Sequence, residues 1–356
     1  MPTAAVVWAP GQPFSLEEVE LDDPRPDEVR VRMLAVGMCH TDLNAASGAL
    51  PYPLPGVLGH EGVGVVEATG AAVTRTRPGD RVVLTFTSCG RCRGCRGGHP
   101  AHCDHQMELN LFGGRRADGS ATLRHKRADL NGHFFGQSSF ATHALVDERG
   151  IVVLPSHLTD AELPILAPLG CGAQTGAGAI LNIIRPRPGD TIAIAGVGAV
   201  GLSAIMATRM TPAGAVIAID RVQSRLDLAR ELGATHTSLG ECPQNVDAII
   251  DTTGNIGLLE MLIDNLGVAG QIALIGAPTA GTRASFDVNR LLLGRSIRGV
   301  TLGDSEPETF IPTLIDAHRQ GSFPLEKLVR TYPFEDINRA AIDASEGVAV
   351  KPVLVF

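Results

Sequence analysis

Residues 191–201 read Thr-Ile-Ala-Ile-Ala-Gly-Val-Gly-Ala-Val-Gly. The run begins with a short strand-like pattern, and residues 199–210 continue it with a helical one. A G-x-G-x-x-G turn between a strand and a helix is typical of a site where the backbone approaches a pyrophosphate. Gly196 permits the tight turn, Gly198 admits the phosphates and Gly201 lets helix and strand pack closely. We therefore predict that these three glycines bind a dinucleotide.

Strand-like and helix-like segments continue to alternate after this turn. Residues 215–219 read as a second strand and residues 224–232 as a second helix, while residues 246–250 and 271–275 read as further strands. Such alternation favours a parallel sheet with helices on both faces. The sequence therefore predicts an α/β domain with a doubly wound parallel sheet of the Rossmann type.

Asp220 ends the second of these strands. A carboxylate at that point accepts hydrogen bonds from both hydroxyls of an adenosine ribose and repels a 2′-phosphate, so we expect NAD rather than NADP. Arg221 could counter that charge, but an arginine beside a retained acid seldom suffices. The alternative is a glycine-rich turn that binds nothing. The order strand, turn, helix, strand, acid favours the cofactor.

The first 150 residues have a different rhythm. Residues 29–36, 64–68 and 81–84 have strand composition and are separated by short turns that carry Pro and Gly, which predicts an antiparallel, barrel-like arrangement. Residues 352–356 read as a last strand. Residues 104–137 are polar and contain glycine, so we expect a long excursion loop outside the core.

Four cysteines form a compact group in the first half of the chain. Cys89, Cys92, Cys95 and Cys103 have two, two and seven residues between them. One short loop with this spacing can wrap four thiolates tetrahedrally around a zinc ion and leave no coordination position open. We therefore predict a closed, structural zinc site.

A second set of candidate ligands is spread along the chain. Cys39, His60 and Cys171 each lie in a glycine-containing segment. Two thiolates and one imidazole make the three-ligand set of a catalytic zinc, which keeps one position open for water or substrate. The sequence thus predicts two zinc ions per chain, one structural and one catalytic.

Composition narrows the class of protein. The 356 residues fit two domains, and 44% hydrophobic residues can build large cores. The formal net charge of -8 argues against nucleic acid or an anionic membrane as a partner. No apolar run reaches the roughly 20 residues that span a bilayer, and the N-terminus lacks the pattern of a signal peptide. Clustered cysteines favour metal binding in a reducing compartment, so we expect a cytoplasmic protein.

Together these motifs resemble the zinc-dependent medium-chain alcohol dehydrogenases. Gly59-His60-Glu61 with Gly64, Gly70 and Val73 matches the family signature. The resemblance covers essentially the whole chain. It implies a GroES-like, β-rich catalytic domain made of residues 1–156 and 302–356, and a Rossmann NAD-binding domain at 157–301. It also implies a homodimer or homotetramer.

The resemblance also implies roles for single residues. Cys39, His60 and Cys171 become the catalytic zinc ligands, and the four clustered cysteines hold the structural zinc. Glu61 matches a transient ligand beside the metal, and Asp42 matches the carboxylate that orients His60. Thr41 matches the acceptor of the substrate proton. Arg225 and Lys351 match contacts to the adenosine end and the pyrophosphate of the cofactor. Many members continue the proton relay with a histidine where this chain has Asn44, so water or another side chain must complete the outer end.

The substrate class is a finer prediction. Residues 134–142 and 168–172 resemble aryl (benzyl-type) and terpenoid alcohol dehydrogenases most. Phe86 and Phe140 are candidates to line an apolar substrate pocket, with a purely structural role as the alternative. We expect reversible oxidation of a primary alcohol, aromatic or allylic, to its aldehyde. Aliphatic or secondary alcohols, or a thiol–aldehyde adduct, are the alternatives.

Three other functions fit the sequence less well. A zinc-free quinone reductase would lack Cys39, the His60-Glu61 pair and the clustered cysteines. A polyol dehydrogenase usually carries a carboxylate in place of Cys171. A zinc-ribbon binding module would not need the dinucleotide turn, and the acidic charge argues against nucleic acid.

Overall fold

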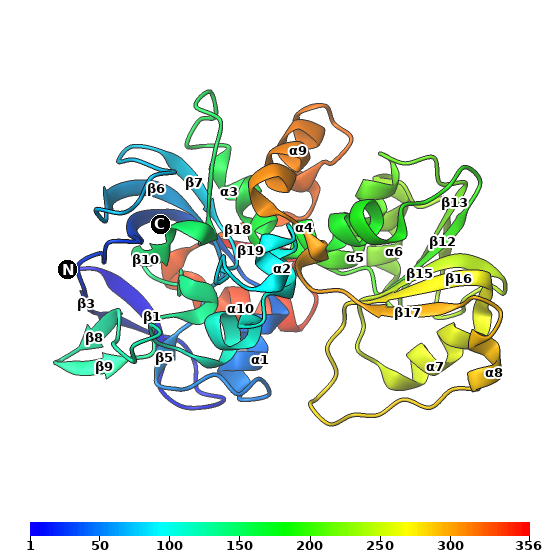
Figure 1. The fold of residues 1–356 in the computed structure, drawn as a ribbon, viewed down its shortest axis with the longest axis horizontal. Coiled ribbons are helices and arrows are strands. Elements are labelled where there is room, and N and C mark those ends of the chain that lie inside the picture. Colours follow the sequence, from blue (N-terminus) through cyan, green and yellow to red (C-terminus); the bar gives the residue numbers. More distant parts are fainter. The chain divides into compact units, whose positions relative to one another are not determined.

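A computed structural model describes residues 1–356, and the chain divides into two compact units. The first unit comprises Met1–Cys171, Glu306–Ile315 and Leu325–Phe356, and the second comprises Gly172–Ser305 and Asp316–Pro324. The N-terminal half and the C-terminal strands thus share one unit, coloured blue to green and orange to red in Figure 1. The expected domain limits at residues 156 and 302 stay predictions.

The second unit is built on a six-stranded parallel sheet with the order β14-β13-β12-β15-β16-β17. Its strands are β12 (Thr191–Ala195), β13 (Ala215–Ile219), β14 (His236–Ser238), β15 (Val246–Asp251), β16 (Leu266–Leu274) and β17 (Ser296–Gly299). Helices α7 (Ile256–Asn265) and α8 (Val288–Leu291) lie on one side of this sheet, and α5 (Ala199–Thr208) and α6 (Gln223–Leu232) lie on the other (Figure 1). The predicted doubly wound fold is confirmed. Its core consists of alanines from β12 and of branched aliphatic residues from β13, β15, β16 and α7.

The first unit contains a seven-stranded sheet with the order β11-β7-β6-β4-β19-β18, in which β10 also pairs with β4. These strands are β4 (Glu28–Gly37), β6 (Glu61–Thr69), β7 (Arg81–Leu84), β10 (His143–Asp147), β11 (Ile151–Val153), β18 (Val329–Pro333) and β19 (Lys351–Val355). All pairs are antiparallel except β18 with β19. A smaller sheet joins β1 (Thr3–Val7), β2 (Ser15–Glu18) and β5 (Gly56–Val57). The antiparallel, β-rich prediction is confirmed.

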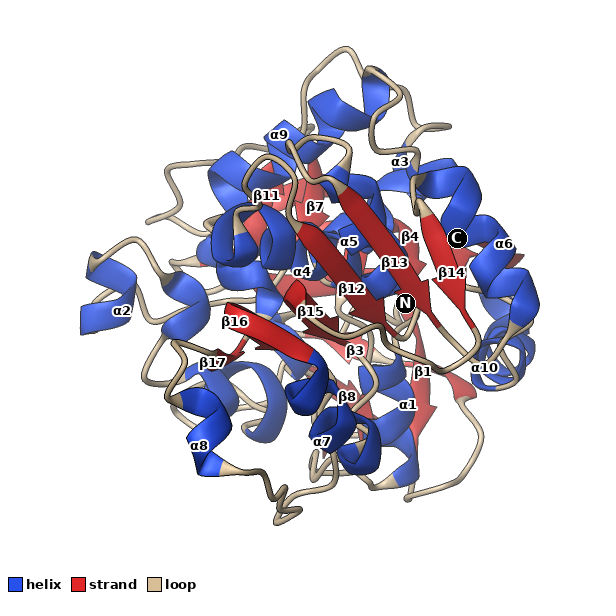
Figure 2. Ribbon diagram, turned by 90° about the vertical axis from the view of Figure 1, so that its right-hand side faces the viewer, coloured by secondary structure: helices blue, strands red, loops and turns tan.

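Short helices connect these strands (Figure 2). They are α1 (His40–Ser47), α2 (Arg93–Arg96), α3 (Leu163–Leu166) and α10 (Ile337–Ser345) in the first unit, α4 (Gly172–Gly178) in the second, and α9 (Pro307–Arg319), which belongs partly to each. No helix combines the length and the hydropathy needed to cross a membrane.

The expected excursion loop at residues 104–137 is wrong in part. The segment forms a hairpin of β8 (Leu123–His125) and β9 (Ala128–Leu130), which pairs with β3 (Glu20–Leu21). Arg116 is buried and donates two hydrogen bonds to Glu28, at 2.6 and 2.7 Å. Polar composition therefore did not mean exposure here, because the buried charge has a partner from β4.

Candidate metal and cofactor sites

The pairing of β4 with β6 brings two distant segments together. Gly37, the last residue of β4, pairs with Glu61, the first residue of β6. Cys39 follows β4 as the residue that precedes α1, and His60 immediately precedes β6. Gly37 has no room for a side chain, because an added Cβ would collide with the Glu61 carboxylate. Strand register thus places Cys39, His60 and Glu61 at one end of the sheet.

These residues and Cys171 form one group of potential metal ligands, which we call the His60 cluster. The sulfurs of Cys39 and Cys171, a nitrogen of His60 and an oxygen of Glu61 all lie within 4.8 Å of one another. Nε2 of His60 is buried and has no hydrogen-bond partner in the structure. A buried nitrogen without a partner is costly unless it coordinates something. Two sulfurs, one imidazole and a nearby carboxylate suit zinc, so the residues present fit this ion.

Asp42 holds the His60 ring from the other side. Its carboxylate is fully buried, and it accepts hydrogen bonds from the backbone N–H groups of Cys39 at 2.8 Å and Gly59 at 3.0 Å. Nδ1 of His60 lies 2.8 Å from Asp42 Oδ1. Burial by itself lowers the pKa of His60, but the charge and hydrogen bond of Asp42, together with those of Cys39, outweigh it and raise this pKa to about 10. The carboxylate therefore keeps a proton on Nδ1 and leaves Nε2 as the metal-binding atom.

Glu61 is paired with a buried ammonium group. Lys351, the first residue of β19, donates to both carboxylate oxygens of Glu61 at 2.9 Å and to the carbonyl oxygen of Met38 at 3.2 Å. Burial raises the pKa of Glu61, against the effect of the Lys351 charge. Burial lowers the pKa of Lys351, but Glu61 and the two cysteines outweigh it and raise that pKa. The proposed contact of Lys351 with a cofactor pyrophosphate stays a prediction.

Thr41 lies beside the same cluster. Its hydroxyl oxygen is 3.7 Å from the sulfur of Cys39, and the residue is half-buried in the first turn of α1. The hydroxyl can thus accept a proton from a group bound next to Cys39. Asn44 is exposed, and its backbone carbonyl accepts from Leu50 at 2.9 Å. The expected proton relay from Thr41 and its outer end stay predictions.

The four clustered cysteines also come together, in a segment that we call the cysteine lobe. Cys89, Cys92, Cys95 and Cys103 have their sulfurs within 4.8 Å of one another. The backbone N–H groups of Cys92 and Cys95 point at the sulfurs of Cys89 and Cys92, at 3.4 and 3.5 Å. Such donors lower the pKa of the Cys92 thiol to about 6. Three of the four cysteines are only partly buried.

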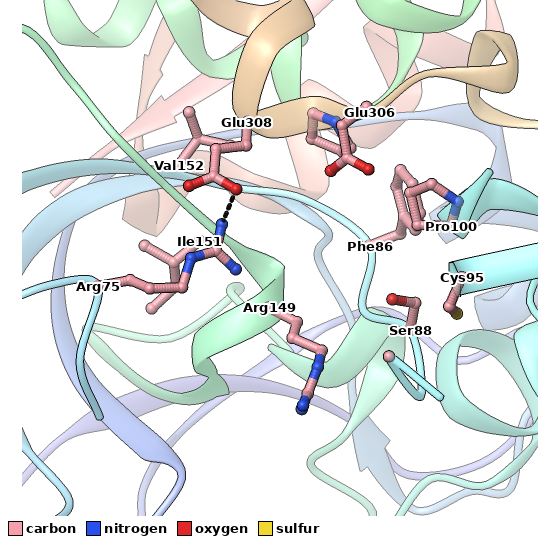
Figure 3. A pocket seen from close by; sticks show the side chains of 12 residues that line it. Arg75, Phe86, Ser88, Cys95, Pro100, Arg149, Ile151, Val152, Glu306 and Glu308 are labelled. Atoms are coloured by element: carbon pink, nitrogen blue, oxygen red, sulfur yellow. Dashed lines mark ion pairs between the residues drawn. The ribbon is translucent and has the colours of Figure 1, made fainter. Parts of the chain in front are cut away.

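A cavity of about 150 Å³ lies against the cysteine lobe in the first unit. Figure 3 shows Phe86, Pro100 and Cys95 on one side of it, and the ion pair of Arg75 with Glu308, at 2.5 Å, on the other. Phe86 therefore lines a cavity, although this cavity contains none of the residues of the His60 cluster.

Phe140 has a different environment from Phe86. It is fully buried and packs edge-to-face on Phe14, with ring centroids 5.7 Å apart. Its ring carbons leave Gly59 no room for a side chain. The packing is that of a core residue, and a role of Phe86 or Phe140 in binding substrate stays a prediction.

The glycine-rich turn of the second unit has the shape of a phosphate cradle. Gly196 has a φ of +81°, and a Cβ at Gly201 would collide with the carbonyl oxygen of Gly196. Nothing lies within 4 Å of the Cβ position of Gly198, so space is open above the turn. Asp220, just after β13, accepts from the backbone N–H of Val197 at 2.8 Å through one oxygen.

Asp220 and Arg225, which are also expected at the cofactor, lie in the second unit. The second oxygen of Asp220 accepts from the backbone N–H groups of Arg221 and Val222, at 2.7 and 3.0 Å. Nε of Arg225 is buried and has no hydrogen-bond partner in the structure. The turn, the acid and this guanidinium fit a dinucleotide.

The sequence reasoning did not assign a role to three residues around His60. Phe135 stacks on its ring with centroids 4.3 Å apart and planes inclined by 20°, and Phe134 meets it edge-on at 5.5 Å. Gln137 is buried and donates to the carbonyl oxygens of His60 and Thr85, both at 3.0 Å. In the sequence, residues 134–142 show only a family resemblance. A Gln among closely spaced aromatic residues is the signal in the sequence that points to them.

Comparison with known proteins agrees with this geometry. Residues 25–156 match the family model of the alcohol dehydrogenase GroES-like domain, and residues 199–317 match that of the zinc-binding dehydrogenases. The chain is 41% identical to a geraniol dehydrogenase of Castellaniella defragrans, across 99% of this chain and 97% of that protein.

Two solved structures are similar over the whole chain. One is an alcohol dehydrogenase zinc-binding domain protein from Burkholderia ambifaria, with a TM-score of 0.96 and 48% identity over 100% of this chain and 98% of the other. The second is the benzyl alcohol dehydrogenase of Acinetobacter calcoaceticus, with a TM-score of 0.94 and 42% identity over 100% and 99%. With both family models and full-length relatives in agreement, the chain belongs to the zinc-dependent medium-chain alcohol dehydrogenases.

Proposed function

We propose that this alcohol dehydrogenase oxidises a primary alcohol with an aromatic or allylic body to its aldehyde, with NAD as the hydride acceptor and with two zinc ions per chain. The observation that carries the proposal is the His60 cluster, where two sulfurs and an unpaired buried Nε2 converge. Zinc held there supplies a Lewis acid that lowers the pKa of the alcohol, and NAD takes up the hydride.

The residues around the cluster prepare this chemistry. Asp42 fixes the His60 tautomer through its 2.8 Å contact with Nδ1. The hydroxyl of Thr41, 3.7 Å from the sulfur of Cys39, receives the proton of the alcohol and passes it outward to water near Asn44. Lys351 holds Glu61 at the edge of the cluster, so that the carboxylate can approach when a ligand exchanges.

The choice of NAD over NADP rests on Asp220. Both of its oxygens already accept backbone hydrogen bonds, which hold the carboxylate in place at the end of β13. A fixed negative charge there repels a 2′-phosphate. We expect the wild type to favour NAD at least about tenfold in kcat/KM, or roughly 1.4 kcal/mol, and Asp220→Gly to weaken this preference. A wild type that favours NADP would contradict the assignment.

The substrate class rests on the relatives and on the aromatic surroundings of His60. The similar proteins bear the names geraniol dehydrogenase and benzyl alcohol dehydrogenase. Phe134 and Phe135 make the neighbourhood of the cluster apolar. An aromatic ring buried on an apolar wall gains a few kcal/mol over a methyl group, at roughly 25 cal/mol per Å².

A panel of alcohols assayed for NADH formation tests the substrate class. We expect kcat/KM for benzyl alcohol and geraniol to exceed that for ethanol at least about 100-fold, which corresponds to roughly 2.7 kcal/mol. Equal values for all three, or a preference for ethanol or a polyol, would contradict the proposed substrate. Metal analysis of the same preparation should give two zinc ions per chain.

We also propose a homodimer or homotetramer in the cytoplasm. Around α8 and the edge strand β17, large apolar side chains are exposed, among them Val268, Val288 and Leu292 at 69%, 66% and 76%. A second copy of the same face would cover them. Light scattering should give two or four chains, and Leu292→Asp should shift the mass toward the monomer. The cytoplasm fits because free thiolates need a reducing compartment.

A further inference from the structure

The imidazole of His60 is held on three sides. Asp42 binds Nδ1 at 2.8 Å, Phe135 covers one ring face at 4.3 Å, and Phe134 meets the ring edge-on at 5.5 Å. A single hydrogen bond fixes one atom of the ring and still allows the plane to tilt about it. The flat contact with Phe135 opposes that tilt, since the two planes are inclined by only 20°.

An unusual turn presents Phe135 to His60. Phe135 has φ +51° and ψ +30°, a left-handed conformation that is uncommon for a bulky residue. Gly136 and Ser138 follow with φ of +65° and +47°. Backbone strain of this kind persists only where the surroundings hold it in place, and it gathers at functional sites.

Hydrogen bonds anchor the turn to the strands of the cluster. Ser138 accepts from the backbone N–H of Phe134 at 2.9 Å and donates to the carbonyl oxygen of Val57 at 2.6 Å. Gln137 donates to the carbonyl oxygen of His60 itself at 3.0 Å and accepts from the backbone N–H of Gly62 at 3.3 Å. The strained turn is therefore tied to the segment that carries His60.

We propose that Phe135 is a positioning residue for His60, whose ring keeps the imidazole in the plane that aims Nε2 at the point shared with Cys39 and Cys171. The inference rests on the proposed zinc-dependent function and deepens it. Partners that orient a metal ligand typically change metal affinity 10- to 100-fold. Phe135 acts on the metal through His60 and would do so with no substrate present.

Zinc release into excess chelator, followed with a metallochromic indicator, tests this directly. In Phe135→Leu, which loses the flat ring, we expect the zinc of the His60 cluster to leave at least about tenfold faster. The zinc of the cysteine lobe should leave at its wild-type rate and so serves as an internal reference. Phe135→Tyr keeps the flat ring and should restore the wild-type rate. In cobalt-loaded protein, Phe135→Leu should shift the visible absorption and Phe135→Tyr should not.

Phe14→Leu is the matched control, because Phe14 and Phe135 are both 6% exposed and Phe14 packs on Phe140 instead. Unchanged zinc release in Phe135→Leu, with only KM for the alcohol raised, would overturn the proposal and make Phe135 a pocket wall. Equal acceleration in Phe14→Leu would also overturn it. If Phe135→Leu does not fold, Phe135→Met replaces it with the same expectation. Wild-type protein without zinc at the His60 cluster would refute the proposed function instead.

Discussion

The cysteine lobe takes all four of its sulfurs from residues 89–103, whereas the His60 cluster takes its ligand atoms from segments that are far apart in the chain. In the lobe the loop itself points backbone N–H groups at the sulfurs, and three of the four cysteines are partly exposed. In the His60 cluster, His60 and Glu61 are fully buried, and charged groups from other elements surround them.

The difference shows whether the fold forms the metal site or the metal forms the local fold. Strand register, α1 and β19 must already be in place before the His60 cluster exists, so the fold creates that site. The lobe has little buried apolar surface of its own, so a metal there would create the local structure. Loss of a ligand should therefore lower the activity when it affects the His60 cluster, and lower the stability when it affects the cysteine lobe.

The largest expected effect is the loss of activity in Cys171→Ser. Removing one thiolate from the His60 cluster weakens the metal site that stabilises the developing charge, a contribution of several kcal/mol. We expect kcat/KM to fall on the order of 10³-fold, while circular dichroism and the thermal unfolding profile stay close to wild type. Unfolding at the temperature of the assay would show that this site, too, builds its surroundings.

Cys89→Ser should give the opposite pattern. The lobe loses its metal and about 3 kcal/mol of stability, while the initial rate at low temperature stays within about twofold. Thermal unfolding and zinc content measured on the same samples check this. A variant that binds one zinc yet unfolds like the wild type would mean that the lobe holds itself together without the ion.

The same contrast explains what could be predicted from the sequence. The lobe was predictable because its spacing alone defines a tetrahedral site, and the Gly196 turn because strand, turn and helix are contiguous. The match of the scattered ligands Cys39, His60 and Cys171 to a zinc set depended on residue type and family resemblance. Their common location follows from the register of β4 with β6, which no local pattern encodes.

Partners without a local pattern were missed. Lys351 meets Glu61 across 290 residues, a contact that no local pattern indicates, while its expected contact with the cofactor stays a prediction. Phe135 reaches His60 only because its backbone takes a left-handed conformation, against the preference of its own side chain. Arg116 lies in the segment that was expected to be an exposed loop. It is buried because its partner Glu28 lies on β4, which is distant in the sequence.

The His60 cluster also contains a buried ion pair, Lys351 with Glu61. Lys351→Met leaves a buried carboxylate without its partner and should cost about 3–5 kcal/mol of stability. The double variant Glu61→Gln/Lys351→Met removes both charges and should recover most of that loss. Chemical denaturation of the three proteins measures it. Equal stability of the single and double variants would mean that burial of Glu61 carries no charge penalty.

The last expected effect is a change of stability with pH that is confined to the His60 cluster. In metal-free protein Asp42 and Cys39 together raise the pKa of His60 from 6.5 to about 10, against the effect of burial, so the imidazolium stabilises the fold. That contribution is complete below pH 6.5 and is lost as the pH rises through about 10. Asp42→Asn removes most of it. The stability gap between wild type and Asp42→Asn, both stripped of metal, should therefore be largest near pH 6 and shrink toward pH 10.

With zinc bound, His60 is neutral throughout, so the gap should vary little with pH. Denaturation curves at pH 6, 8 and 10, with and without metal, measure both gaps. A metal-free gap that stays constant over this range would show that Asp42 acts only through its backbone hydrogen bonds to Cys39 and Gly59.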